Sequence, residues 1–279
     1  MSQLTTINEA VQFIEAHLRD PITVGEVAEA VGYSLYHFSR TFNRIVQHTP
    51  YDYLMRRRVS ESAADVLTTE RLMIDIAYDY QFANPETFTR AFRRMFGATP
   101  SDVRARGFLP HRDAMPPLSL ADLAHRSDPD AAKPRRIAAP PLVLVGFQSL
   151  IADDASPRVD ALWQLLRDEV TRRELNPSRY YAVHQTASPP HAAYSVMSVG
   201  IKLDEPEALA PLVKFALTQR QAIHCPHHGS SADLPLTISY VIHTWLPKAR
   251  LWPSASPLLL DYGDKPGGAE IAPLSIAVG

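Results

Sequence analysis

The sequence contains a single cysteine, Cys225, among its 279 residues. One thiol cannot form a disulfide within the chain, which excludes a disulfide-stabilised secreted framework and indicates a reducing compartment. No apolar run approaches the roughly 18 residues of a membrane-spanning helix, and no basic segment followed by an apolar stretch opens the chain. We therefore expect a soluble, cytoplasmic protein with no membrane partner.

Lysine is absent before Lys133, whereas arginines are concentrated between residues 40 and 106. The net charge of -2 gives no overall basic balance of the kind that nucleic-acid binders often carry. Clustered guanidinium groups can nevertheless grip phosphates through forked, bidentate bonds. A Gly-rich phosphate loop and a spaced Ser, His and Asp set are also missing, so we predict no cofactor and no catalytic residues.

A repeat dominates the first hundred residues. Val27-Ala28, Phe38-Ser39-Arg40-Thr41-Phe42 and Thr49-Pro50 return as Ile76-Ala77, Phe88-Thr89-Arg90-Ala91-Phe92 and Thr99-Pro100. The early members recur 49 residues later and the later members 50, as in a duplicated helical unit with one insertion at its turn. Two tandem units predict a protein that reads two stretches of one long partner, and duplex DNA is the natural candidate.

Capping signals predict a helix, a turn and a second helix in each copy. Thr23 and Glu26 form a capping-box pattern, Gly32 suits a left-handed turn, and Ser34 is an N-cap candidate. In the second copy, Asn84 is the N-cap candidate and Pro85 occupies the first helical position. A helical stripe from Tyr51 to Leu67 connects the copies.

The second copy departs from the first at two positions. Leu72 stands where Thr23 caps the first copy, and Gln81 stands where Gly32 makes the turn. A missing cap and a non-glycine residue in the left-handed region each cost on the order of 1 kcal/mol. We therefore expect the second unit to be locally weaker.

The exposed faces of the two second helices are the expected sites of base reading, because such helices contact base edges through their N-terminal residues. Arg40 and Arg90 could each fork onto a guanine or clamp a phosphate, Glu86 could accept a hydrogen bond from cytosine, and Thr87 could lie near a thymine methyl. The alternative is that these are solvated faces of a helical bundle. The candidate DNA-binding residues are Tyr36, Ser39, Arg40, Pro85, Glu86, Thr87, Arg90 and Arg94.

Residues from about 7 to 108 resemble the AraC/XylS family DNA-binding domain. The strongest part is Gln81-Phe82 followed by the run from Phe88 through Gly97-Ala98-Thr99-Pro100 to Arg104. The resemblance implies an all-α domain over residues 1–109, in which two helix-turn-helix units joined by a long helix enter adjacent major-groove segments of promoter DNA. RNA polymerase becomes a partner if the protein is an activator.

Residues 110–134 are rich in proline and read as a linker, with a short helix around Leu118 to Leu123 as an option. Beyond them, strand and helix patterns alternate. The predicted order is a strand at Leu142 to Gly146, a helix at Val159 to Leu175, strands at Tyr180 to His184 and Tyr194 to Leu203, and then the same order again at Ala222 to His228, Thr237 to Leu246, Leu258 to Tyr262 and Glu270 to Val278. The fold class is therefore multidomain, with an α+β domain of two strand-helix-strand-strand repeats over residues 135–279.

This second domain resembles the GyrI-like small-molecule-binding domain. The resemblance rests on Gly146-Phe147, Trp163, His227-His228-Gly229, Trp245-Leu246-Pro247 and the run from Pro257 to Tyr262. It implies a groove for a small-molecule effector, with aromatic walls and an acidic residue on a late strand. The candidate effector-binding residues are Trp163, Tyr181, Trp245, Asp261 and Tyr262.

The identity of the acidic residue is open. Aligning Tyr262 with the family's tyrosine places Leu260 where the family has a glutamate, which favours a neutral aromatic effector. A shift of one residue brings Asp261 into that place, although strand alternation otherwise points Asp261 to the opposite face. Two other functions stay open for this domain: a small-molecule hydrolase, which Leu260 disfavours by removing the general base, and a protein-binding module.

His224, Cys225, His227 and His228 form a cluster of metal-ligating residue types. In a strand, Cys225 and His227 face one way while His224 and His228 face the other, so the four cannot converge on one ion without a sharp distortion. We therefore predict no metal site.

Overall fold

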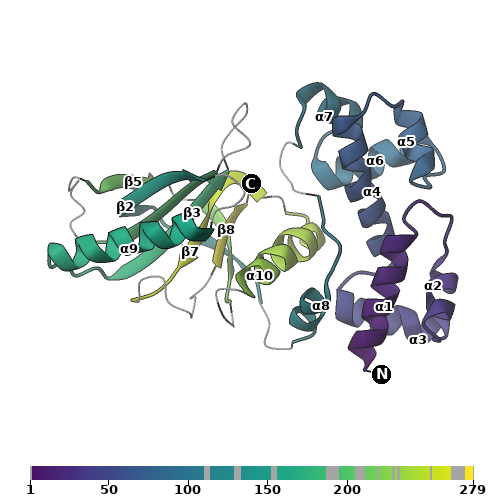
Figure 1. Ribbon diagram of the computed structural model, residues 1–279, viewed down its shortest axis with the longest axis horizontal. Helices are drawn as coiled ribbons and strands as arrows, with labels where there is room; N and C mark the ends of the chain where they lie inside the picture. The colour runs from purple at the N-terminus through teal and green to yellow at the C-terminus, as the bar shows by residue number, and fades with distance from the viewer. Residues whose placement is uncertain are drawn as a thin grey trace. The chain divides into compact units, whose positions relative to one another are not determined.

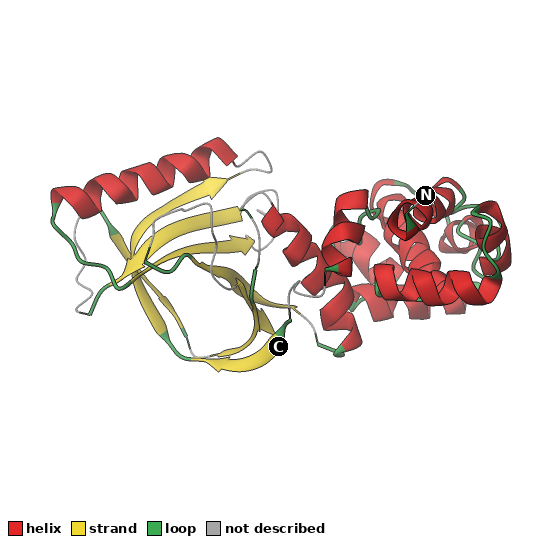
Figure 2. Cartoon of the chain, turned by 90° about the horizontal axis from the view of Figure 1, so that it is seen from below, coloured by secondary structure: helices red, strands yellow, loops and turns green. Residues whose placement is uncertain are grey.

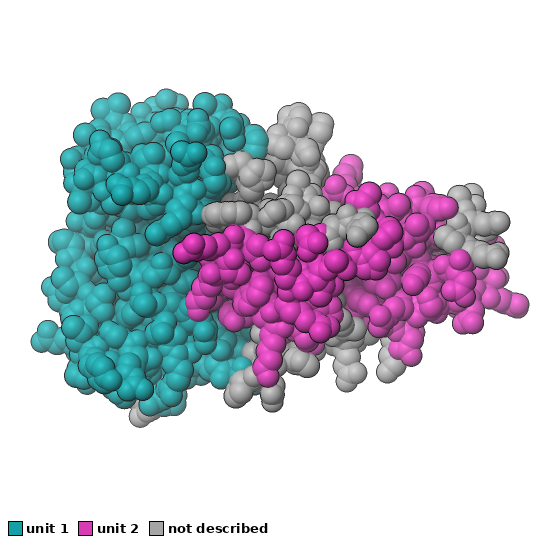
Figure 3. Space-filling view, turned by 180° about the vertical axis from the view of Figure 1, so that it is seen from behind, with its two compact units in different colours: residues 1–129 teal, residues 130–279 magenta. Residues whose placement is uncertain are grey.

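The computed structural model describes residues 2–109, 114–128, 133–151, 156–186, 195–204, 211–218, 220–227, 230, 233–251, 253–264 and 274–278. The chain divides into two compact units, residues 1–129 and residues 130–279 (Figure 3). Within the described ranges, no helix is both long enough and apolar enough to cross a membrane.

Unit 1 is helical throughout its described residues (Figure 1). The helices of the two repeated copies are the pairs α2/α3 and α5/α6, and the long α4 connects them. This confirms the predicted all-α domain. The helices are α1 (Gln3–Ala16), α2 (Val24–Ala30), α3 (Leu35–Val46), α4 (Pro50–Thr68), α5 (Met73–Asp79), α6 (Pro85–Phe96), α7 (Pro100–Arg106) and α8 (Leu120–Ser127).

The helices of the repeat begin where the capping signals place them. The Thr23 hydroxyl accepts from the Glu26 backbone N–H and the Glu26 carboxylate accepts from that of Thr23, which completes the capping box of α2. Ser34 caps α3 and Asn84 caps α6 through their side-chain oxygens. Leu72 gives α5 no side-chain cap, as its apolar side chain requires.

Both copies contribute equivalent aromatic rings to a single core. Phe38 and Phe42 of α3 and Phe88 and Phe92 of α6 are fully buried. The rings within each pair lie 5.3 Å and 5.6 Å apart between centroids, within the range of favourable aromatic contact. Because these rings occupy one face of each helix, the opposite faces of α3 and α6 point toward solvent.

Part of the stretch that composition assigns to a linker is folded onto unit 1. Residues 114–128 lead into α8, whose N-terminus carries a capping box between Ser119 and Asp122. Met115, Leu118 and Leu123 are buried in the same core as the repeat. Proline content marks this stretch as irregular, but its apolar side chains supply enough contact area to fix it in place.

Unit 2 consists of an eight-stranded sheet in its described residues and helices that pack on it. The structure adds two strands, β1 and β5, that the sequence pattern does not predict. Both are only five residues long and mostly exposed, which makes the signal of a strand weak; β1 begins with two arginines, and β5 carries Lys214. The elements are β1 (Arg135–Ala139), β2 (Leu142–Ile151), α9 (Ser156–Arg172), β3 (Arg179–Thr186), β4 (Ser195–Lys202), β5 (Val213–Leu217), β6 (Arg220–Cys225), α10 (Leu234–Tyr240), the π-helix η2 (Val241–Trp245), α11 (Leu246–Lys248), β7 (Pro253–Asp261) and β8 (Leu274–Val278).

The strand order is β1-β6-β8-β7-β3-β4-β2-β5, and every pairing is antiparallel. The elements β2-α9-β3-β4 form one half of the sheet and β6-α10-β7-β8 the other, and the halves meet where β3 pairs with β7. The strand that precedes each half crosses over: β1 pairs with β6, and β5 pairs with β2. Each half therefore carries an edge strand from the other.

The two faces of the sheet carry different side chains because neighbouring residues of a strand point to opposite sides. Val145, Ile201 and Leu260 face the helices and pack with Leu166 of α9. Leu144, Tyr181, Val183 and Leu259 form a smaller cluster on the other face. Figure 2 shows α9 lying along one face of the curved sheet.

Candidate nucleic-acid interface

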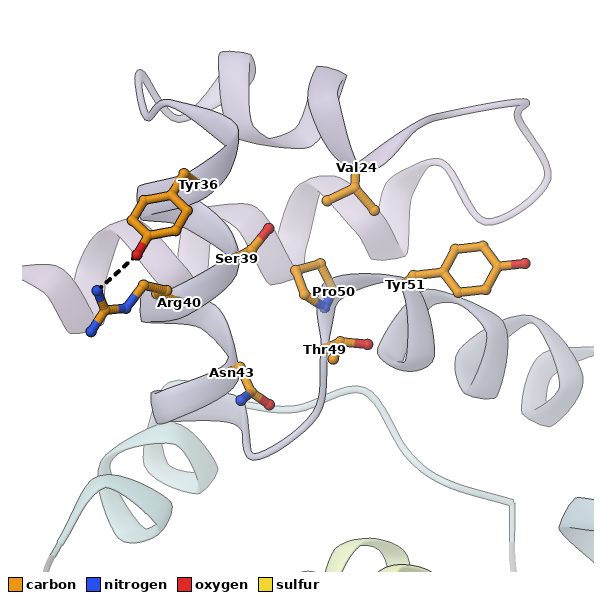
Figure 4. A pocket seen from close by; sticks show the side chains of 8 residues that line it. All are labelled: Val24, Tyr36, Ser39, Arg40, Asn43, Thr49, Pro50 and Tyr51. Carbon is orange, nitrogen blue, oxygen red and sulfur yellow. Dashed lines mark hydrogen bonds between the residues drawn. The ribbon is translucent and has the colours of Figure 1, made fainter.

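The exposed face of α3 is organised around Tyr36 and Arg40. Tyr36 is 72% exposed, and Arg40 one turn later is also exposed. An Nη1 hydrogen bond of 3.1 Å runs from Arg40 to the Tyr36 hydroxyl (Figure 4), and the guanidinium carbon lies 5.6 Å from the ring centroid. The ring contact and the hydrogen bond restrain the orientation of the guanidinium.

A cavity of about 480 Å³ opens on this face. Asn43 and Tyr51 belong to its wall, although neither was predicted as a DNA-binding residue from the sequence. Asn43 follows Ser39 by four residues and therefore lies on the same helix face, so helical spacing from Ser39 could have predicted it. Figure 4 shows the lining side chains, which come from α2, from α3 and from the N-cap and first turn of α4: Val24, Tyr36, Ser39, Arg40, Asn43, Thr49, Pro50 and Tyr51.

On α6, the predicted residues divide between the cap and the open surface. Pro85 is partly buried at the first helical position, and Glu86 beside it is exposed. The Thr87 hydroxyl donates to Asn84 Oδ1 at 2.6 Å and is thus engaged in the cap. Arg90 and Arg94 are exposed. Arg93, which precedes Arg94 in the last turn of the helix, is exposed as well.

The arginines that cluster in the sequence do not all face solvent. Arg57 and Arg58 are buried, at 3% and 5% exposure. Arg57 Nε donates to Glu15 at 2.9 Å, and Arg58 donates to the carbonyls of Leu18 and Asp20. The expectation of a uniformly phosphate-gripping cluster is therefore wrong for these two side chains, which connect α4 to the end of α1.

The second helix-turn-helix copy is supported by contacts with Arg19, which lies between α1 and α2. Gln81 adopts φ of 60°, in the left-handed region, and its Nε2 donates to the Arg19 carbonyl at 2.6 Å. The Arg19 guanidinium donates to the Tyr80 hydroxyl at 2.8 Å and to Asp65 at 3.1 Å. These long-range bonds compensate for the missing side-chain cap at Leu72 and for the left-handed conformation of Gln81.

His48 fixes the junction between α3 and α4. The side chain is 1% exposed, and its Nδ1 lies 2.7 Å from Asp52 Oδ2. Burial lowers the pKa of His48, and the positive charge of Arg56 acts in the same direction. Burial raises the pKa of Asp52, but the hydrogen bond from His48 and the charge of Arg56 outweigh it and hold that pKa well below its usual range.

This arrangement, two exposed helix faces each presented by a helix-turn-helix and joined by one long helix, defines a DNA-binding protein of the helix-turn-helix class. The family model of the helix-turn-helix domain matches residues 27–106. Regulatory protein SoxS of Escherichia coli strain K12 is 38% identical over 106 residues, which cover 38% of this chain and 99% of SoxS. The right origin-binding protein of the same strain is 35% identical over 122 residues, covering 44% of this chain and 42% of that protein.

Among solved structures, the DNA-binding domain of AdpA, a global transcriptional factor in complex with a target DNA, aligns with 25% identity. Its TM-score is 0.35, and the alignment covers 36% of this chain and 91% of that chain. The near-complete coverage of SoxS decides the family. The chain belongs to the AraC family of helix-turn-helix transcriptional regulators.

In unit 2, three of the aromatic candidates lie on the helix-bearing side of the sheet. Trp163 is 4% exposed, and its ring contacts the Tyr262 ring edge-on at 4.9 Å between centroids. Trp245 packs against the same cluster. Burial raises the pKa of Tyr262, and the negative charge of Asp160 adds to the shift. Asp160 precedes Trp163 by three residues, a spacing that could have singled it out.

The structure does not bring the other two candidates to that cluster. Tyr181 and Asp261 are cross-strand partners on β3 and β7, on the face opposite Leu260. The Asp261 carboxylate lies 3.1 Å from Arg179 Nη1 and accepts from the Gly263 backbone N–H at 2.9 Å. The residue that points toward Trp163 is Leu260, and the charge of Asp261 is matched by Arg179.

The histidine and cysteine cluster is dispersed. Within the described ranges, no group of three or more His, Cys, Asp or Glu side chains is arranged around a metal position. His227 has Nδ1 2.8 Å from the Thr237 hydroxyl and Nε2 2.9 Å from the Ser230 carbonyl. Burial raises the pKa of Cys225 to about 12, and His228 lies outside the described residues.

Proposed function

We propose that α3 and α6 read two successive major-groove segments of promoter DNA in the cytoplasm. The observation that supports this is the exposed, mutually restrained pair of Tyr36 and Arg40 on α3, with the exposed Arg90 at the equivalent place on α6. An extended guanidinium can donate two hydrogen bonds to guanine or to a phosphate. RNA polymerase is a further partner if binding activates transcription.

A spacing series tests this reading. Duplexes are selected from a random library by the full chain, and their affinity is measured by fluorescence anisotropy at several salt concentrations. Since α4 connects the units within one core, the two half-sites should lie about one helical turn apart, roughly 34 Å, and moving them by half a turn should abolish specific binding. Failure to bind any duplex above background would eliminate the proposal.

We further propose that residues 135–279 form a GyrI-like domain whose small-molecule effector alters DNA binding. Support comes from the aromatic contact of Trp163 with Tyr262, beside Trp245 and the buried Leu260. An apolar, aromatic cluster with no buried carboxylate among its described residues suits a neutral aromatic effector better than a cation. The effector must interact differently with two arrangements of the protein to change DNA affinity.

A ligand panel tests the effector. Neutral and cationic aromatic compounds are titrated into the full chain while tryptophan fluorescence and thermal stability are followed. A neutral compound that shifts both signals in the native chain but not in Trp163→Leu supports the proposal. Turnover of a panel compound that is lost in Tyr262→Phe would favour a hydrolase, and a stable protein partner without any ligand-induced shift would favour a protein-binding module.

A further inference from the structure

The segment between the repeat and the sheet is hydrogen-bonded to α4. Met115 N donates to the Ser60 hydroxyl at 3.0 Å, and Arg57 donates to the Met115 carbonyl. Leu118 N donates to the Tyr53 hydroxyl at 3.3 Å. These three contacts use backbone groups of the segment, so α4 fixes the path of its backbone as well as the positions of its side chains.

The same segment reaches the end of the first reading helix. α8 packs against α1 and α3. Arg126, 6% exposed, donates from Nη1 to the carbonyl of Val46 at 3.1 Å, and Val46 is the last residue of α3. The positive charge of Arg126 also acts on His48, which fixes the turn into α4. The guanidinium therefore satisfies a carbonyl that the helix itself leaves without an intrahelical donor.

Helices α6 and α3 end on different residues. Helix α6 ends on Gly97 in the left-handed conformation, whereas α3 ends on Gln47, a residue for which this conformation is less favourable. The additional donor from α8 thus serves the helix end that has the less suitable capping residue. SoxS is matched over 99% of its length by 106 residues, so it is a regulator of about the size of residues 2–109 alone.

We propose that residues 114–127 form a clamp that sets the position of α3 on DNA, with Arg126 as its positioning residue. The inference rests on the proposal that α3 reads DNA. Arg126 touches no base in this role; it holds the C-terminal end of α3 so that Tyr36 and Arg40 are presented at a fixed depth.

The test uses the full chain and a library-selected duplex. Arg126→Ala should weaken specific binding about tenfold and relax base preference only at the base pairs that Arg40→Ala also relaxes. Arg126→Lys retains a donor near the Val46 carbonyl and should recover most of the affinity. Arg104→Ala is the matched control. Arg104 donates to the Val66 and Arg71 carbonyls beside the second helix-turn-helix copy, so this substitution should leave the base preference at those base pairs unchanged.

Each result decides the matter. The proposal is overturned if Arg126→Ala binds within twofold of the native chain while Arg40→Ala does not, or if affinity falls evenly at all base pairs in step with the melting temperature. Should Arg126→Ala fail to fold, Arg126→Lys with native melting temperature but uniformly relaxed preference overturns it as well. If Arg40→Ala has no effect, the proposal that α3 contacts bases is wrong, and the proposal that residues 114–127 position α3 is then wrong as well.

Discussion

The two helix-turn-helix units use the same pair of left-handed residues in exchanged places. In the first copy, Gly32 makes the turn at φ of 71° and Gln47 ends α3 at 64°. In the second, Gln81 makes the turn at 60° and Gly97 ends the helix at 76°. The duplicated fold dictates the backbone conformation, and the residue that must adopt it differs between copies. Comparable geometry is thus maintained by different interactions.

The source of support also differs. Gln47 stabilises its own position locally by donating to the Arg44 carbonyl at 3.0 Å, whereas Gln81 depends on the distant Arg19 carbonyl. The capping box of α2 is local, while α5 has no side-chain cap. The first copy therefore relies more on local bonds, whereas the second relies on bonds from Arg19, which follows α1, and on packing against α4.

Removing the two arginines that we propose to contact bases should produce the largest effects. Arg40→Ala and Arg90→Ala should each cost about 1 to 3 kcal/mol of specific binding. Because we propose that each arginine contacts its own groove segment, the two variants should relax base preference in different halves of the site. Anisotropy titrations of single-base variants of the selected duplex measure this. Arg172→Ala on α9 is the control, and relaxation of the same base pairs by both variants would contradict separate reading.

Exchanging the caps should sharpen the difference between the units. Leu72→Thr supplies a hydroxyl to the uncapped N-terminus of α5 and should raise the unfolding free energy by about 1 kcal/mol, whereas Thr23→Ala should lower it by a similar amount. Urea unfolding followed by circular dichroism gives both values. Leu120→Thr, at an exposed leucine behind the existing Ser119 cap, should change little. A destabilised Leu72→Thr would show that Leu72 contributes contacts that outweigh a cap.

Two substitutions of Gln81 separate strain from tertiary support. Gln81→Ala retains the left-handed strain and loses the bond to Arg19, so it should lose about 0.5 to 1.5 kcal/mol of stability. Gln81→Gly loses the same bond but relieves the strain, and should lie within about 1 kcal/mol of the native chain. Thermal unfolding of the pair measures the difference. Equal melting temperatures would mean that the left-handed conformation carries no cost here.

The pH dependence of stability should show the smallest effect. The folded-state pKa of His48 is lowered, so the unfolded chain takes up a proton near pH 6.5 before the folded chain does. Stability is complete above pH 6.5 and falls as the pH drops from that value toward the folded-state pKa; the contribution of Asp52 is lost only below its usual value of 3.8. His48→Gln should flatten the decline that begins at pH 6.5 in urea titrations. An unchanged slope would place the titrating group elsewhere.

Local signals predicted most of unit 1 because caps, prolines and left-handed glycines act on their own helices. The helix starts at Thr23, Ser34 and Asn84 follow from those residues alone. The bond from Gln81 to Arg19 could not be predicted, since it joins residues far apart in the sequence. The burial of Arg57 and Arg58 was missed for the same reason, because charge in a sequence does not reveal which carbonyls and carboxylates fold around it.

In unit 2, the apolar strands were predictable and the edge strands were not. Leu142 to Gly146 and Tyr180 to His184 lie inside β2 and β3, whereas β1 and β5 carry exposed charge. Alternation also predicted that Leu260 and Asp261 face opposite sides, but not which side carries the helices. The pairing of Asp261 with Arg179 and the charge of Asp160 near Tyr262 depend on that choice.

The crossed edge strands have a consequence for the order in which the protein matures on the ribosome. β1 emerges early but finds its partner β6 only after β2 through β5 have been made. The helices of unit 1, α8 included, by contrast pack on helices of the same unit, all of which precede β1 in the sequence. A nascent chain therefore acquires its DNA-reading half while the sheet is still incomplete, and β1 remains an unpaired edge until translation has passed β6.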